Sequence, residues 1–123
     1  MRDDKPNIIV DKTIEFSLLI IDFSELLESN RKYVLARQLL KSGTSVGANV
    51  QEAQNAESKA DFIHKMKIAA KEADETKYWL LLCQRSKHYP DCKELQEKLF
   101  EIIKILSKII SSSKKPFSNL QIN

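Results

Sequence analysis

Three side chains of the kinds that bind zinc lie close together near the middle of the second half of the chain. Cys83, His88 and Cys92 could supply three of the four ligands of a structural site. A fourth is missing, because His64 would lie roughly 28 Å from Cys83 along one helix. Two cysteines are also too few for a disulfide framework. We therefore expect no metal site, and two free thiols in a reducing cytoplasm.

A carboxylate spaced for use with a histidine is the second candidate for chemistry. Di-iron helical bundles take carboxylates from all four helices and two Glu-x-x-His pairs. Asp61 and His64 give the one acidic-x-x-His spacing, since Arg85 stands three residues before His88. A single pair cannot build the site, so the sequence does not support a di-iron centre.

The small and hydroxyl residues from Ser42 to Asn49 look like a loop that cradles phosphate. The segment lacks the Gly-Lys-Ser/Thr ending, and no strand is expected before it, so P-loop geometry is not supported. A hydroxyl nucleophile would need an oriented base, and neither Lys41 nor Lys71 has triad spacing. We expect no catalytic residue and no cofactor here.

The structural alternative for this segment rests on its two glycines. Each should cost about 1 kcal/mol relative to alanine inside a helix, and close helix approach is the ordinary compensation. We expect Gly43 and Gly47 to face Ala69 and Ala73 on the following helix. The neighbouring polar side chains would then form hydrogen bonds to nearby groups: Ser42, Thr44, Ser45 and Asn49.

Further polar residues could meet between the same two predicted helices. One helix carries Asn49 and Glu52, and the next carries four more: Lys71, Glu72, Glu75 and Thr76. Side by side, they would form a partly buried network that specifies register. Paired carboxylates serving acid–base work or a metal are the alternative. We favour the structural network.

Aromatic residues beside cations can stack on bases or anchor interfaces. Tyr78 and Trp79 lie next to Lys77 and near Arg85. An ordinary core tryptophan is the alternative, and we favour it.

Four long helices must position all these residues. The chain has only two glycines and three prolines, too few for the turns of an all-β fold. Apolar spacing and capping residues predict helices over about 8–29, 32–55, 58–86 and 91–112, with Pro90 in the first turn of the last helix. Short connections give an all-α, antiparallel up-down-up-down four-helix bundle as a single domain over residues 1–123.

The first predicted helix has more apolar surface than one core can cover. Ile14, Leu18 and Ile21 form one stripe, which we expect to face the bundle. A second stripe is rotated from it and predicts a contact with another copy of the chain: Phe16, Leu19 and Phe23. The sequence thus predicts a homo-oligomer.

Charge is distributed unevenly, although the net charge is only +3. Segment 11–29 has a net charge of −4, and segment 31–56 has +3. Four cations in the latter are candidates for nucleic-acid binding: Arg31, Lys32, Arg37 and Lys41. No apolar run approaches the length that spans a bilayer, so we expect no membrane contact and a cytoplasmic location.

Two stretches resemble a known bacterial family. They are Gln38–Ala53, which contains Ser-Gly-Thr-Ser-Val-Gly-Ala-Asn, and Ser58–Leu80, which contains Ala-Ala-Lys-Glu-Ala-Asp-Glu-Thr-Lys-Tyr-Trp. The family is the four-helix-bundle proteins encoded by intervening sequences of large-subunit ribosomal RNA genes, often given a ribosomal-protein label. The resemblance covers roughly residues 7–112, and Gln51 departs from the acidic residue common there. Its motif positions are Gly43, Thr44, Ser45, Gly47, Asn49, Glu52, Lys71, Glu72, Glu75 and Trp79.

The resemblance implies a ring-like homopentamer, similar in fold to the accessory protein of diversity-generating retroelements, and no enzymatic activity. We therefore expect a non-catalytic oligomeric scaffold that binds RNA or DNA through basic surfaces repeated by symmetry. A protein–protein interaction module without nucleic-acid binding is the alternative, and a catalytic bundle comes third. No small-molecule substrate is evident.

Overall fold

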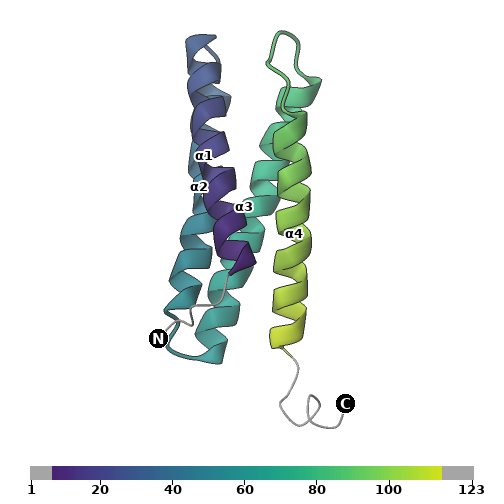
Figure 1. Ribbon diagram of the computed structural model, residues 1–123. Coiled ribbons are helices and arrows are strands. Elements are labelled where there is room, and N and C mark those ends of the chain that lie inside the picture. The colour runs from purple at the N-terminus through teal and green to yellow at the C-terminus, as the bar shows by residue number, and fades with distance from the viewer. Residues whose placement is uncertain (1–6, 115–123) are drawn as a thin grey trace.

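The computed structural model describes residues 7–114, and within them the protein is all-α, with four helices and no strand. The helices are α1 (Ile8–Ser29), α2 (Tyr33–Gln54), α3 (Lys59–Arg85) and α4 (Lys93–Ser113). These bounds differ from the predicted ones by at most two residues at any end. The chain reverses direction at each turn, so that all four helices lie along one long axis (Figure 1).

Local side-chain chemistry explains where the helices begin. The Asn7 side chain accepts a hydrogen bond from the Val10 amide, and the Ser58 hydroxyl accepts one from the Asp61 amide. Pro90 lies in the α3–α4 connection and not in the first turn of α4, which corrects the sequence prediction. Helix α4 begins three residues later, after Cys92.

The helices pack in order around the bundle. Helix α2 contacts both α1 and α3, and α3 contacts α4, while α1 and α4 approach each other less closely. Two ion pairs connect this looser seam at the surface. The Lys98 Nζ lies 3.1 Å from Glu15 Oε1, and the Lys12 Nζ lies 3.7 Å from Glu101 Oε1.

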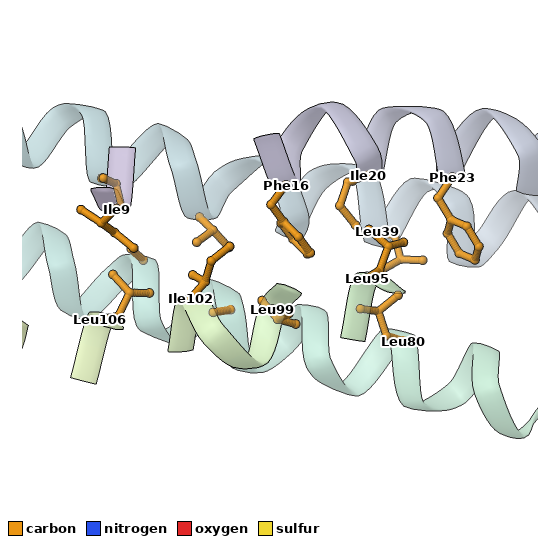
Figure 2. Packing of buried hydrophobic residues seen from close by; sticks show 14 of the residues in the cluster. Ile9, Phe16, Ile20, Phe23, Leu39, Leu80, Leu95, Leu99, Ile102 and Leu106 are labelled. Carbon is orange, nitrogen blue, oxygen red and sulfur yellow. The ribbon is translucent and has the colours of Figure 1, made fainter. Parts of the chain in front are cut away.

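One apolar core runs along the bundle, with side chains from all four helices. Helices α1 and α4 face each other across it through large residues such as Phe16 and Leu99, as Figure 2 shows. Helices α2 and α3 contribute Leu39 and Leu80, both fully buried. Burial of side chains of this size stabilises the fold by about 1.5–3 kcal/mol each.

The predicted orientation of α1 is wrong. Phe16 is fully buried and Phe23 nearly so, and Leu19 packs against the core, whereas we expected all three at an interface. The expected core stripe is instead exposed: Ile14 (45%), Leu18 (58%) and Ile21 (37%). The physical reason is size, because two phenylalanines remove more apolar area from water than the aliphatic stripe does.

Candidate functional site

The two thiols are placed for packing and not for reaction. Cys83 and Cys92 are free and almost fully buried. Burial, with a smaller contribution from Cys92, raises the pKa of Cys83 to about 12, and burial followed by the charge of Asp91 raises the pKa of Cys92. Both are therefore neutral thiols near pH 7, whereas zinc ligation and nucleophilic attack need thiolates. Among residues 7–114, no cluster of acidic, cysteine or histidine side chains could hold a metal ion.

Asp61 and His64 have different environments in the structure. The Asp61 carboxylate accepts a hydrogen bond from the Glu57 amide at 3.2 Å, and its own amide donates to Ser58 Oγ. These contacts make Asp61 part of the start of α3. The His64 side chain is exposed to solvent. The two residues therefore form no common site.

The glycines of α2 allow close packing, but against α1 and not against α3 as expected. A Cβ on Gly43 would lie 2.9 Å from Ile20 side-chain carbons. One on Gly47 would lie 3.3 Å from the Thr13 carbonyl oxygen and from the Ser17 hydroxyl. Ala69 and Ala73 are buried on α3, and neither supplies any of the atoms nearest to the added Cβ groups. The prediction assigned the small residues of α2 to the wrong neighbour, because α2 contacts two helices.

The hydroxyl and amide groups beside these glycines are used within the fold. Thr44, Ser45 and Asn49 each donate to the carbonyl oxygen of the residue four positions earlier on α2, at 2.6, 2.6 and 2.9 Å. Ser42 is buried and its Oγ lies 2.8 Å from Thr76 Oγ1 on α3. The predicted hydrogen bonds of these polar side chains to nearby groups are therefore confirmed, although the glycines face α1.

The wider polar network predicted between α2 and α3 does not form as one unit. Glu52 pairs with Lys65, whose Nζ lies 2.9 Å from Glu52 Oε1; this bond raises the pKa of Lys65. Glu75 accepts a hydrogen bond from the indole of Trp79 on its own helix. Lys71 is exposed and Glu72 half-buried on α3, and no side-chain bond joins either to Asn49 or Glu52. Only the Ser42–Thr76 contact crosses between the helices as a buried polar pair.

The four predicted nucleic-acid-binding cations fall into two places. Arg31 and Lys32 lie in the α1–α2 turn, where Arg31 has a φ of 64° and the Lys32 ammonium is 5.1 Å from the centre of the Tyr89 ring. Arg37 and Lys41 are exposed along the side of α2. Arg31 and Lys32 thus lie in the turn before α2, and Arg37 and Lys41 follow along α2 itself.

The exposed aliphatic stripe of Ile14, Leu18 and Ile21 is the first candidate interaction surface, here named the α1 outer face. The chain reverses direction between α1 and α2, so the contact of Gly43 with Ile20 places Leu40 near the level of Phe23. Leu40 on the neighbouring helix α2 is itself 41% exposed. Exposed carboxylates flank the stripe on α1: Asp11, Asp22 and Glu25.

A second candidate surface lies between α3 and α4. It is a groove of about 310 Å³, named here the α3–α4 groove. Its apolar lining consists of Leu80, Leu81, Leu99 and Ile103, and its remaining lining residues are Asp74, Lys77, Tyr78, Gln96 and Phe100. The sequence reasoning singled out Tyr78 and Lys77 but missed Phe100. A phenylalanine outside the apolar seam of α4 was the available signal.

None of the four helices, over the part of the chain described, has the length and apolarity that crossing a membrane requires.

The chain is similar to one protein family and to a solved structure. The model of the 23S rRNA-intervening sequence protein family matches residues 5–108. A crystal structure from Bacteroides thetaiotaomicron, of a protein of unknown function in the S23 ribosomal protein family, is 42% identical. The match covers 83% of this chain and 97% of that one, with a TM-score of 0.79. A comparison with curated proteins finds no match. None of these similarities attributes a catalytic role to the fold.

Proposed function

Because the chain belongs to the 23S rRNA-intervening sequence protein family, we propose that it is a non-catalytic scaffold that self-associates and binds nucleic acid. The subunits are antiparallel four-helix bundles that assemble into a ring, with five copies as the expected number. The α1 outer face carries the first half of this proposal. Three aliphatic side chains in one stripe, each 37–58% exposed, form a surface that a second copy would cover.

Charge favours a head-to-tail contact over a two-fold one. In a two-fold contact through the α1 outer face, the carboxylates of Asp22 and Glu25 would approach those of the second copy. Like charges at such an interface cost several kcal/mol. Head-to-tail contacts place this acidic surface against a different one, and they close into a ring when the rotation permits.

The test of self-association is the mass in solution. A ring of five predicts five times the 14.2 kDa of one chain by light scattering after size exclusion. Leu18→Glu should shift the mass to that of one chain, because a buried carboxylate without a partner is costly. Phe100→Glu, at a side chain of similar exposure on α4, is the matched control and should leave the mass unchanged. A single-chain mass for the unaltered protein at micromolar concentration would exclude the assembly.

The nucleic-acid half of the proposal rests on repetition of charge. One chain carries +3, so five copies carry +15 on one assembly. Binding should then tolerate any sequence and weaken steeply between about 50 and 200 mM salt, since counterions are released. Fluorescence anisotropy with unrelated RNA and DNA measures this. If no binding occurs at low salt, the protein–protein module without nucleic acid replaces the proposal.

A further inference from the structure

Within residues 7–114, the α3–α4 half carries the positive charge and the α1–α2 half is net negative. Lys67, Lys71, Asp74, Tyr78, Leu81 and Arg85 follow one another at gaps of three and four residues, which places them on one side of α3. Lys77 borders the α3–α4 groove from the same helix, and Lys93 and Lys104 are exposed on α4. None of these six cations makes an ion pair with a residue in 7–114.

The charge balance distinguishes this surface from the others. Three carboxylates line the groove or the shallow hollow beside it: Asp74, Asp91 and Glu97. The α3–α4 half of the protein, residues 59–114, carries twelve Lys or Arg side chains against eight Asp or Glu, a net charge of +4. Residues 7–58 carry five such cations against seven carboxylates, a net charge of −2. A polyanion would be attracted to this side more than to any other.

Two aromatic rings stand at the edges of the same groove. Tyr78 on α3 is 54% exposed and Phe100 on α4 is 61% exposed. The Lys104 ammonium lies 5.3 Å from the centre of the Phe100 ring. The groove between them, at about 310 Å³, is at the small end of ligand pockets and has an apolar floor.

We propose that the α3–α4 groove binds single-stranded nucleic acid, with bases stacked on Tyr78 and Phe100 and phosphates along the flanking cations. This inference rests on the nucleic-acid-binding function proposed above and specifies its surface and its strand type. Proteins that bind single strands commonly present exposed aromatic rings beside a row of cations, because every base has a flat apolar face that can stack on a ring. A duplex keeps those faces covered by its own stacking, so the rings favour the single strand. An acidic peptide could satisfy the cations but would offer the rings no flat partner.

The experiment measures anisotropy of labelled oligouridine and oligothymidine of about 15 nucleotides. Tyr78→Ser and Phe100→Ser should each weaken binding about fivefold to 100-fold, the range for loss of one stacked base. Tyr33→Ser is the matched control, because Tyr33 is 50% exposed but lies at the start of α2. Lys71→Glu with Lys104→Glu should flatten the salt dependence, whereas Arg37→Glu with Lys41→Glu should change it less.

The outcomes separate this inference from the proposed function. Ring-dependent binding that favours single strands over a duplex of equal length supports the inference. Binding that is insensitive to both rings but lost in the Arg37/Lys41 variant overturns it and keeps the proposed function. Failure of the unaltered protein to bind any oligonucleotide at low salt refutes both. If Tyr78→Ser or Phe100→Ser instead changes the assembly mass, the groove is a protein contact and the inference is wrong.

Discussion

The α1–α2 pair and the α3–α4 pair belong to the same bundle but are packed differently. Gly43 and Gly47 bring α2 so close to α1 that an added Cβ would meet atoms at 2.9–3.3 Å. No glycine lies on α3 or α4, and these helices leave a groove between two exposed rings, Tyr78 and Phe100. Helix α1 nevertheless exposes an aliphatic stripe on its outer side. The backbone spacing of each pair is thus set by its side chains.

The chemistry of the two outer surfaces differs in the same way. The α1 outer face is aliphatic with carboxylates beside it, which suits another protein surface of matching shape. The surface around the α3–α4 groove is aromatic and cationic, which suits a strand with phosphates and bases. Two surfaces on opposite pairs can be occupied together. A head-to-tail ring uses the α1 outer face and a second surface of each subunit, and the groove stays available when that second surface lies elsewhere.

The largest expected effect concerns the close packing of the α1–α2 pair. Gly47→Leu should lower the free energy of unfolding by about 1–3 kcal/mol or more, because the new side chain must displace the Thr13 backbone. Ala48→Leu is the matched control, since the next residue on α2 is exposed. Urea unfolding followed by circular dichroism measures both. An increase in stability for Gly47→Leu, as helix propensity alone would give, would contradict the close contact.

An intermediate effect concerns the end of the α3–α4 pair, where Cys83 and Cys92 are buried. The folded-state pKa of Cys83 is about 12, above the ordinary value of 9.0. Its contribution to stability is therefore complete below pH 9 and is lost as the pH rises towards 12, because the unfolded chain ionises first. We expect the unfolding free energy to fall by about 1–2 kcal/mol between pH 9 and 11 from this group.

The measurement compares the unaltered protein with Cys83→Ala across that pH range. Other groups titrate in both proteins, so the difference in slope reports Cys83. Equal slopes would mean that this end of the α3–α4 pair admits water, and the open groove would then extend further than the structure indicates.

Helix positions could be predicted from the sequence, because spacing, caps and the scarcity of turn residues all depend on neighbouring residues. The side of α1 that faces the core could not be predicted in this way. Both apolar stripes have helical periodicity, and only the packing of Phe16 and Phe23 against the other helices decides between them. The helix that the glycines contact could not be predicted for a similar reason. Gly43 and Ser42 are neighbours in sequence, but Gly43 contacts α1 and Ser42 contacts α3.

The candidate surfaces were predictable only in part. Tyr78 and Lys77 attracted attention because they adjoin in sequence. Phe100 lies more than twenty residues away, and its place opposite Tyr78 depends on how α4 returns along α3. The charge count along the sequence pointed to segment 31–56, because its four cations lie close together in the sequence. The excess on the α3–α4 side is spread over two helices and becomes visible only when they are packed together.

The smallest expected effect tests whether surface charge holds the two pairs together. Glu15 on α1 and Lys98 on α4 form an exposed ion pair at 3.1 Å across the looser seam. Glu15→Gln should lower the free energy of unfolding only slightly at low salt and by less near 1 M salt, because exposed pairs are screened. Chemical denaturation with urea, which leaves ionic strength unchanged, measures this. Glu28→Gln is the control, since this exposed glutamate on α1 makes no ion pair among residues 7–114. If Glu15→Gln instead cost as much stability as Gly47→Leu, the ion pair would be a main contribution to the packing of α1 against α4. A small cost would mean that even paired surface charges contribute little to folding, so the unpaired cations beside the α3–α4 groove are free to serve a partner.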